Sequence, residues 1–357
     1  MQKQVSIIMP RYSESPELLK KALYSIENQA GYDLNKVELI IVDDCGPTEL
    51  KIPKTPSYSY TIKIIRLEKN AGPGWARQVG IDAAEGEWIY MLDADDQLFP
   101  TAFCLFSMAE PEKFDWVSFP GMQLGEKDQQ GAIGPHKGNL TWVFGHFIRR
   151  EYIKKTKVKF HKQIRSNEEQ VFLQGLMARI DPTRGRELDI PIYLWCQQST
   201  DTITRINNCE YARTCVPEWI LGRKLVLDDL SSIGKIQELK SNLVQAMIHV
   251  YYSVHQTLFD DYDDWKENVE LLAGWMYRGY VDSCESIAAD EIKQLVLQGA
   301  ASCDRQVTES YDDWLERIKE LPDPKYCLQP HETMDKNKQT GEEVTSYNRI
   351  LIDELEG

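Results

Sequence analysis

The first hundred residues alternate short apolar stretches with amphipathic ones, and this alternation limits the possible fold more than any other feature of the chain. Strands are expected at residues 5–9, 37–42, 61–67 and 87–92. Helices are expected at residues 16–29, where apolar side chains recur on one face, and at residues 75–84, which end before Gly86. Strand and helix alternation of this kind is typical of an α/β fold with a doubly wound, mostly parallel sheet.

The rest of the chain has a different pattern. Residues 115–119 are expected to form a further strand, residues 123–138 a loop, and residues 140–152 an apolar segment that continues into a basic helix. Long helical patterns follow Asn207, at residues 216–229, 232–259, 265–284, 290–304 and 311–321. The polar tail, residues 322–357, is expected to carry a short helix at its end. We therefore predict an α/β domain over residues 1–206 and a mainly helical region over residues 207–357.

Charge is distributed unevenly between these two parts. The chain has a net charge of −15, and residues 207–357 carry 15 Lys and Arg against 29 Asp and Glu. An acidic second part disfavours nucleic acid and anionic membranes as partners, whereas the nearly neutral first part can bind a small anion. No apolar stretch is long enough to cross a bilayer and the N-terminus lacks a secretory signal, so we expect a soluble, cytoplasmic protein. The eight cysteines lack metal-binding spacing and are expected to be reduced thiols.

Polar or conformationally special residues follow each of the four predicted strands where it ends. They are Pro10, Tyr12 and Glu14 after the first strand, Asp43 and Asp44 after the second, Asn70, Gly72 and Arg77 after the third, and Asp93, Asp95 and Asp96 after the fourth. In an open parallel sheet, ligands bind at the carboxyl ends of the strands. A single Asp or Asn after a strand often only stabilises a turn, but four such strand ends together predict a ligand site.

The acidic run Asp93-Ala94-Asp95-Asp96 is the most informative of these clusters. Three carboxylates within four residues repel one another unless a cation or an arginine lies nearby. Mg²⁺ and Mn²⁺ prefer oxygen ligands and complete their shell with phosphate oxygens and water. The run therefore predicts a metal site, the alternative being an acidic loop that caps the helix expected near residue 100. Because no glycine-rich dinucleotide or P-loop motif is present, diphosphate binding through a metal points to nucleotide-sugar chemistry.

Three segments carry a resemblance to a known enzyme family. They are VSIIMPRYSESPELLKKALYSIENQ, VELIIVDDCG and NAGPGWARQVGIDAAEGEWIYMLDADDQLFP. In this order and spacing they resemble the family 2 inverting glycosyltransferases of GT-A fold, over about residues 4–100 and more weakly to about residue 206. The resemblance implies transfer of a hexose or N-acetylhexosamine from a UDP-sugar to an acceptor hydroxyl, with Mn²⁺ or Mg²⁺ as cofactor. No Gln-x-x-Arg-Trp motif follows, so the processive, membrane-embedded subgroup is disfavoured.

The resemblance also implies roles for individual residues. The donor site would contain Pro10, Tyr12, Glu14, Asp44, Asn70, Arg77, Asp93, Ala94, Asp95 and Asp96. Pro10 and Tyr12 would border the base and ribose, and Asp44 would accept a hydrogen bond from the uracil imide. Asn70 and Arg77 would line the base and diphosphate region.

The catalytic end of the site follows from the same resemblance. Asp93 would contact ribose or sugar hydroxyls, and Asp95 would bind the metal, with Asp96 sharing the metal or lying close to the donor sugar. Glu168 and Glu169 match the Glu-Asp pair that supplies the family's catalytic base. Because the family usually has Asp at the position of Glu169, the base is left open between these two residues. A solvated helix start with Asn167 as its cap is the alternative.

Further positions are implied with less specific roles. Trp142, Gly145 and His146 lie where the family places donor-sugar or acceptor contacts, and His146 is expected to be structural. Thr204 or Arg205 would contact the diphosphate. The aromatic residues of the C-terminal region are expected to form a helix core. That region is expected to shape the acceptor site or to form a homo-oligomer interface.

Two other functions fit part of the same pattern. A nucleotidyltransferase would use a similar sheet and metal-bound carboxylates, although the basic, glycine-rich signature near its first strand is absent here. A non-catalytic module would bind the nucleotide-sugar without transfer or hydrolysis. The acceptor stays open among a glycan, a protein, a lipid-linked sugar and, because of the acidic second part, less readily a modified nucleic acid.

Overall fold

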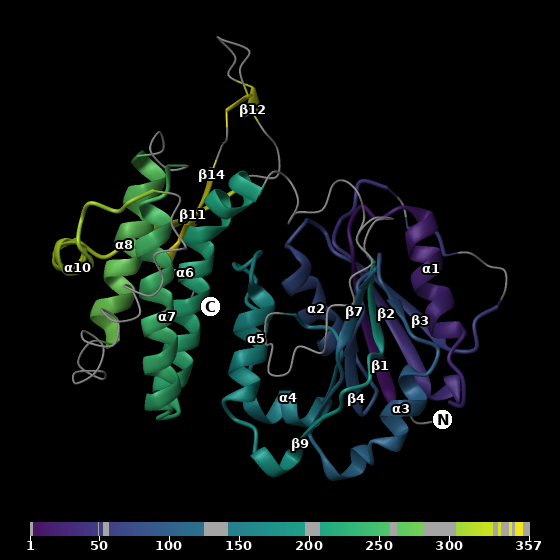
Figure 1. Cartoon of the computed structure of the whole chain (residues 1–357). Coiled ribbons are helices and arrows are strands. Elements are labelled where there is room, and N and C mark those ends of the chain that lie inside the picture. Colours follow the sequence, from purple (N-terminus) through teal and green to yellow (C-terminus); the bar gives the residue numbers. More distant parts are fainter. Residues whose placement is uncertain are drawn as a thin grey trace. The chain divides into compact units, whose positions relative to one another are not determined.

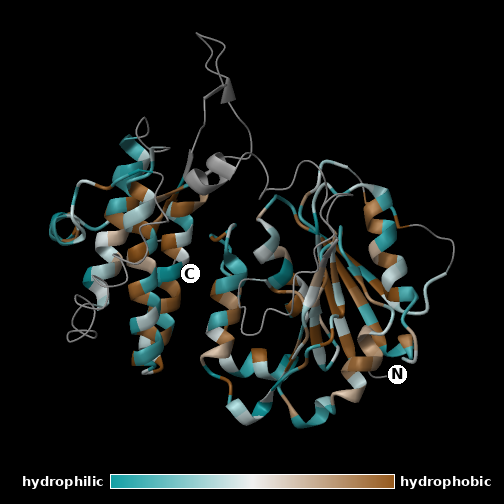
Figure 2. Ribbon diagram, in the orientation of Figure 1, coloured by the Kyte–Doolittle hydropathy of each residue, from teal (hydrophilic) through white to brown (hydrophobic). Residues whose placement is uncertain are grey.

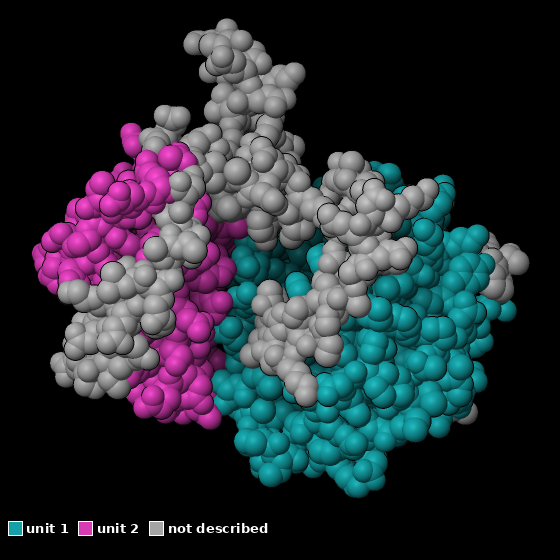
Figure 3. Space-filling model, viewed as in Figure 1, with its two compact units in different colours: residues 1–199 teal, residues 200–357 magenta. Residues whose placement is uncertain are grey.

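The computed structural model divides the chain into two compact units, Met1–Ser199 and Thr200–Gly357 (Figure 3). The structure describes residues 3–48, 50–52, 57–124, 142–196, 208–257, 263–280, 305–330, 335–336, 343–344 and 347–352. The division between the units and the boundary expected after residue 206 both fall among residues 197–207, which lie outside the described residues. Each unit is therefore described by itself.

The first unit is built on a seven-stranded sheet of order β3-β2-β1-β4-β8-β6-β9 (Figure 1). Its strands are β1 (Val5–Arg11), β2 (Val37–Asp43), β3 (Thr61–Arg66), β4 (Trp88–Met91), β6 (Trp116–Ser118), β8 (His146–Arg149) and β9 (Gly185–Glu187). Strands β3, β2, β1 and β4 are parallel, β8 is antiparallel to both of its neighbours, and β9 is parallel to β6. The expected α/β fold with a mostly parallel sheet is confirmed.

The register places the ends of the first three strands at one level. Arg11 at the end of β1 is the partner of Asp43 in β2, which is in turn the partner of Arg66 in β3. The polar residues that follow these strands therefore emerge at the same edge of the sheet, as the sequence predicts. Strand β3 is the outer strand at this side, and its side chains are mostly exposed.

Helices and a small second sheet complete the unit. The helices are α1 (Pro16–Glu27), α2 (Pro73–Asp82), α3 (Ala102–Met108), α4 (Arg150–Thr156) and α5 (Glu168–Met177), with 3-10 turns at Leu34–Lys36, Pro111–Lys113 and Pro182–Arg184. The second sheet has the order β5-β10-β7, from Gln97–Leu98, Tyr193–Cys196 and Gly121–Leu124. Helix α2 begins two residues earlier than expected, because a proline at its first position is preorganised for a helix start. The segment expected at residues 140–152 divides into β8 and α4.

Apolar side chains fill both faces of the main sheet. Ile7 and Leu39 belong to a buried cluster that includes residues of α1 and α3. Their neighbours in the chain, Ile8 and Ile40, belong to a second cluster with residues of α2 and α5. Figure 2 shows the apolar strands of this sheet between amphipathic helices. Burial on both faces explains why these strands are nearly continuous apolar runs.

Strand β2 contains a buried carboxylate that sequence reasoning passed over. Glu38 Oε1 accepts hydrogen bonds from Ser6 Oγ at 2.5 Å, from the backbone N–H of Glu85 at 2.7 Å and from that of Gly86 at 3.1 Å. The N–H of Gly86 also donates to Ser6 Oγ at 2.8 Å. The group joins β1 and β2 to the turn that leads into β4.

The second unit is mainly helical. Its helices are α6 (Asn208–Ser232), α7 (Ile236–Val254), α8 (Asp263–Tyr280) and α10 (Tyr311–Lys319). Four of the five expected helices are confirmed, and the fifth, at residues 290–304, lies outside the described residues. The expected start of the second helix at Ser232 is wrong, because α6 continues to that residue and Gly234, at φ 71°, separates the two helices.

The tail also differs from expectation. Strand β11 (Tyr326–Pro330) pairs antiparallel with β14 (Tyr347–Leu351), and β12 (Asp335–Lys336) pairs with β13 (Glu343–Val344). Residues 347–351 therefore form a strand, and the last residues of the tail, 353–357, where the short helix is expected, lie outside the described residues.

The core of the second unit is aromatic, as expected. Trp265 and Trp314 are fully buried, and Tyr251 lies 5.4 Å from Trp314 between ring centroids. Trp314 Nε1 donates to Glu270 Oε1 at 3.2 Å, and Arg317 pairs with both oxygens of the same carboxylate at 2.7 and 2.9 Å. Within the described ranges, no helix is both long enough and apolar enough to cross a membrane.

Candidate active site

The turn after β1 presents the first group of predicted donor-site residues. Pro10 is buried in β1 as the register partner of Val42. The backbone N–H of Tyr12 donates to Glu14 Oε2 at 2.8 Å, and the Tyr12 side chain is 38% exposed. Burial raises the pKa of Glu14, although hydrogen bonds from the backbone oppose the shift. The turn therefore presents an accessible aromatic ring at the carboxyl end of the sheet.

Two buried carboxylates follow at the end of β2 and have different partners. Asp43 pairs with Arg66 and so ties β2 to β3. Asp44 accepts from the backbone N–H of Ala71 at 2.7 Å and from that of Gly72 at 2.8 Å, one on each carboxylate oxygen. These two bonds fix the carboxylate of Asp44 to the loop before α2.

The loop between β3 and α2 approaches α5 closely. Asn70 Oδ1 accepts from the N–H of Gly72 at 3.2 Å, and the Asn70 carbonyl accepts from Arg165 at 3.2 Å. Gly72 has φ 87°, a conformation that glycine adopts without strain. A Cβ on Gly74 would lie 2.4 Å from Cγ of Glu168, so this position needs a glycine for the two helix starts to meet.

The acidic run forms a turn in which the carboxylates are not equivalent. The N–H of Asp96 donates to the carbonyl of Asp93 at 3.2 Å. Asp96 is only 3% exposed, and its two oxygens accept from Tyr193 Oη at 2.5 Å and from the N–H of Cys196 at 2.7 Å. Burial, together with the neighbouring Asp95 and Asp93, raises the pKa of Asp96 well above its usual value. Asp96 thus anchors β10, and metal binding at its oxygens would compete with these bonds.

Arg77 lies at the centre of the site and joins three carboxylates. Its Nη1 donates to Glu168 Oε1 at 2.8 Å, and its Nη2 lies 2.8 Å from Asp93 Oδ1 and 3.0 Å from Glu169 Oε1. Burial alone would lower the pKa of Arg77, which is 3% exposed, but the three carboxylates outweigh burial and raise it. A fixed cation therefore connects α2, the acidic turn and the start of α5.

The two glutamates at the start of α5 differ in environment. Glu169 Oε2 accepts from the backbone N–H of Val143 at 2.9 Å, opposite its contact with Arg77. Burial raises the pKa of Glu169, Arg77 lowers it, and Asp93 raises it further, and the net shift is upward. The Glu169 side chain is 18% exposed against 7% for Glu168. The accessible carboxylate with the raised pKa is therefore Glu169.

Aromatic rings line the segments beside these carboxylates. Trp142 stacks on Phe144 with 5.4 Å between ring centroids, and Phe144 stacks on Tyr193 at 4.5 Å. Trp142 also lies 5.9 Å from Trp195. Because Tyr193 bonds to Asp96, the stack extends from the acidic turn to the segment that contacts Glu169.

His146 has a structural role, as the sequence predicts. Its Nδ1 accepts a hydrogen bond from Trp116 Nε1 at 3.2 Å, across the pair β6 and β8. Burial lowers the pKa of His146 to about 4, so the imidazole is neutral at pH 7. The predicted diphosphate contacts Thr204 and Arg205 lie outside the described residues.

Comparison with known proteins assigns the chain to a family. The sequence model of the family "Glycosyl transferase family 2" matches residues 6–166 of this chain. The matched segment includes the strand ends described above. The succinoglycan biosynthesis protein ExoO of Rhizobium meliloti (strain 1021) is 31% identical over 255 residues, which cover 64% of this chain and 70% of ExoO. The chain belongs to glycosyl transferase family 2.

Solved structures extend the likeness of this glycosyltransferase beyond the matched segment. Staphylococcus aureus TarS 1–349 in complex with UDP gives a TM-score of 0.64 at 16% identity, over 96% of this chain and 98% of that one. The complex of the same TarS fragment with UDP-GlcNAc gives a TM-score of 0.55 at 17% identity, again over 96% of this chain and 98% of that one. In sequence, the S. aureus (strain Mu50) poly(ribitol-phosphate) β-N-acetylglucosaminyltransferase TarS is 33% identical over 95 residues, 26% of this chain and 16% of TarS. The structural likeness confirms the expected GT-A type of fold.

The acidic turn of this glycosyltransferase fits a metal that takes few protein ligands. Among the residues that the structure describes, no group of three or more His, Cys, Asp or Glu side chains could hold a metal ion. Asp93 pairs with Arg77, Asp96 anchors β10, and Asp95 lies half-buried between them in the same turn. One carboxylate with phosphate oxygens and water is a donor set that Mg²⁺ commonly takes.

The structure brings most predicted site residues of this glycosyltransferase to one edge of the sheet and shows which partners they contact there. Arg77 contacts carboxylates instead of lying open to a diphosphate, and Ala94 is buried in the core. Tyr193 and the backbone N–H of Val143 contact predicted site residues, Asp96 and Glu169, and the sequence did not indicate either contact. The apolar run just before Gln197 could have indicated strand β10 (Tyr193–Cys196), but no feature of that run indicates a contact with Asp96.

Proposed function

We propose that this family 2 glycosyltransferase moves a hexose or N-acetylhexosamine from a UDP-sugar to an acceptor hydroxyl in one inverting step. The observation that carries the proposal is the Arg77 cluster, which joins the acidic turn to the accessible carboxylate of Glu169. A donor held at the turn would thus lie beside a base of raised pKa. The UDP and UDP-GlcNAc complexes of TarS support a uridine donor.

The donor half of the site would be formed by the first three strand ends. Asp44 would accept from the imide N–H of uracil, and its two bonds to the loop before α2 hold it ready for that contact. Tyr12 would cover the base or ribose with its exposed ring, while Asn70 shapes the same loop. Preorganised polar groups of this kind give a pocket its specificity.

Asp95 would hold Mn²⁺ or Mg²⁺ together with the donor diphosphate. When bound, the metal would stabilise the negative charge of the departing diphosphate as a Lewis acid. Asp96 would act indirectly, because its bonds to Tyr193 and Cys196 fix the turn that presents Asp95.

Glu169 would act as the general base of the transfer step. The acceptor oxygen attacks the anomeric carbon as the bond from that carbon to the diphosphate oxygen breaks, and UDP leaves. Glu169 takes the proton of the acceptor hydroxyl in the same step. Arg77 and the N–H of Val143 hold its carboxylate from two sides, which leaves little freedom to rotate. Glu168 would position Arg77.

The test is the pair of variants Glu169→Gln and Glu168→Gln. Glu169→Gln should retain UDP affinity, measured by calorimetry with Mn²⁺, and lose sugar transfer by at least about a hundredfold, as expected for a general base. Glu168→Gln should lose less. Transfer that survives in Glu169→Gln and disappears in Glu168→Gln would reverse the assignment.

A donor screen separates this function from the two alternatives. A nucleotidyltransferase would release pyrophosphate from UTP and a sugar phosphate, and a binding module would bind the donor without turnover. The glycosyltransferase should release UDP from one UDP-sugar, slowly to water and faster with acceptor. A thermal shift panel of nucleotide-sugars with and without Mn²⁺ would first identify the donor.

A further inference from the structure

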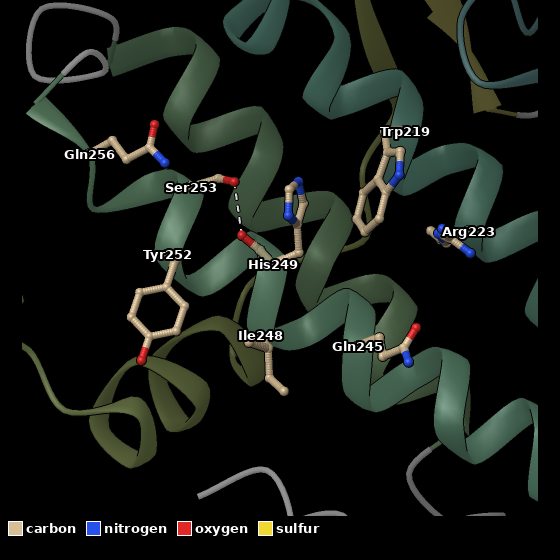
Figure 4. Close-up of a pocket in the computed structure, with 8 residues that line it drawn as sticks. All are labelled: Trp219, Arg223, Gln245, Ile248, His249, Tyr252, Ser253 and Gln256. Carbon is tan, nitrogen blue, oxygen red and sulfur yellow. Dashed lines mark hydrogen bonds between the residues drawn. The ribbon is translucent and has the colours of Figure 1, made fainter. Parts of the chain in front are cut away.

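A pocket of about 560 Å³ lies between two helices of the second unit, apart from every residue discussed above. Helix α6 contributes Trp219 and Arg223, which are four residues apart and so share one face. Helix α7 and the residues after it contribute Gln245, Ile248, His249, Tyr252, Ser253 and Gln256 (Figure 4). Ligand pockets in proteins have volumes of about 300–1,000 Å³, so the cavity is of a size that accepts a small molecule.

The cation of the pocket is held in a defined position. The Arg223 guanidinium lies over the Trp219 ring at 4.9 Å from its centroid, and Nη1 donates to Asn242 Oδ1 of α7 at 3.2 Å. Asn242 is itself fixed, because its Nδ2 donates to the carbonyl of Glu238 at 2.9 Å. Burial lowers the pKa of Arg223 to about 10, which leaves it charged at pH 7. A guanidinium fixed in this way is suited to a planar or tetrahedral oxyanion.

Several of the described residues that line the pocket beside Arg223 carry neutral polar side chains. The His249 imidazole lies beside the Trp219 ring (Figure 4), with 4.5 Å between the two ring centroids. Gln245 and Gln256 carry amides that both donate and accept, as hydroxyl groups require. Ser253 Oγ is directed to the carbonyl of His249 at 2.8 Å. Among the lining residues that the structure describes, none is a carboxylate, although residues 207–357 carry 29 Asp and Glu.

We propose that this pocket binds a small anionic saccharide, with its phosphate or carboxylate on Arg223 and its hydroxyl groups on the glutamine amides. An anion in the pocket would meet no carboxylate among the described lining residues, whereas a cationic ligand would meet Arg223. The neutral amides and the apolar flank of Ile248 suit a polyhydroxylated ring better than a bare inorganic ion. The pocket shares no residue with the donor site proposed above, and binding to it does not depend on transfer.

The experiment is a calorimetric titration of the full chain with glucose 6-phosphate, glucuronate, glucose and inorganic phosphate. Glucose 6-phosphate or glucuronate should bind, and whichever binds more tightly identifies the anionic group. Arg223→Gln should weaken that binding by about tenfold or more, in line with the loss of a hydrogen bond to a charged group. Affinity should fall as salt rises, because the interaction is electrostatic.

A matched pair of exposed substitutions keeps the test valid if Arg223→Gln disturbs folding. Gln245→Glu places a negative charge in the pocket and should weaken binding, whereas Gln237→Glu makes the same change on the same helix outside the pocket and should not. Far-UV circular dichroism and thermal unfolding serve as the folding control for all variants, because all three positions lie in helices of the second unit. Equal affinity for glucose and glucose 6-phosphate, equal affinity for inorganic phosphate, or equal effects of the two glutamine substitutions would overturn the proposal.

Discussion

Replacement of Arg77 by leucine should be among the most damaging single changes in the first unit. Arg77 is 3% exposed and contacts Glu168, Asp93 and Glu169 at 2.8, 2.8 and 3.0 Å. Removing the cation leaves three carboxylates close together without compensation. Breaking a buried ion pair by removing one partner costs about 3–5 kcal/mol, a large part of the about 5–15 kcal/mol that stabilises a typical domain.

The same change should move the pH dependence of turnover. A general base acts in its ionised form, so turnover falls as the pH drops through its pKa. Arg77 is the main group that lowers the pKa of Glu169 against burial and Asp93. Without Arg77 that pKa rises further, and the acid limb of the pH profile of kcat/KM should shift to higher pH. Arg77→Lys keeps the positive charge, although an ammonium group lacks the planar fork that contacts three carboxylates. Because the charge remains, this variant should shift the acid limb of the pH profile less than Arg77→Leu.

Urea unfolding and the pH profile of UDP release are the measurements. Arg184→Ala is the matched control, because Arg184 also donates twice to one carboxylate, Asp115, at 2.7 and 3.0 Å but is 39% exposed. An exposed pair contributes below about 1 kcal/mol. If Arg77→Leu and Arg184→Ala had similar unfolding midpoints, or if the acid limb of the Arg77 variants stayed in place or moved down, the reasoning would be refuted.

Three further changes test other parts of the site. Asp95→Ala should lower the affinity for UDP in the presence of Mn²⁺ and leave the metal-free affinity unchanged by calorimetry; equal losses in both conditions would exclude a metal ligand. Gly74→Ala should reduce turnover more than UDP affinity and destabilise the chain by about 1–3 kcal/mol, since its Cβ would lie 2.4 Å from Cγ of Glu168; a wild-type kcat would contradict this. Glu38→Ala should lower unfolding stability by about 2–4 kcal/mol, because three donors lose their acceptor, and a loss below about 0.5 kcal/mol would show that water replaces it.

Much of the first unit could be predicted from sequence because its information is local. Each strand of the parallel sheet is a short apolar run, and each strand end is followed by residues that differ sharply from it. The position of Asp44, Asn70 and Asp93 at one edge follows from the topology rule alone. The same rule cannot say which carboxylate faces a ligand, because that depends on partners elsewhere.

The missed contacts join residues that are far apart in the chain. Arg77 and Glu168 are separated by 91 positions, and Tyr193 and Asp96 by 97. A single sequence gives no signal for such pairs, since each residue is ordinary in its own segment. The strands of the tail were missed for a similar reason, because β14 pairs with β11 about twenty residues earlier in the chain.

Strand β3 has a consequence for how the protein behaves in concentrated solution. It is the outer strand of its sheet, and Ile64 on it is 48% exposed. An open edge of this kind can pair with the edge of another molecule and start aggregation, and charged side chains on the edge oppose this. Lys63 and Arg66 are both exposed on the same strand and repel a second copy. Purification at high salt would screen this repulsion, so low ionic strength is the safer choice for keeping the chain monodisperse.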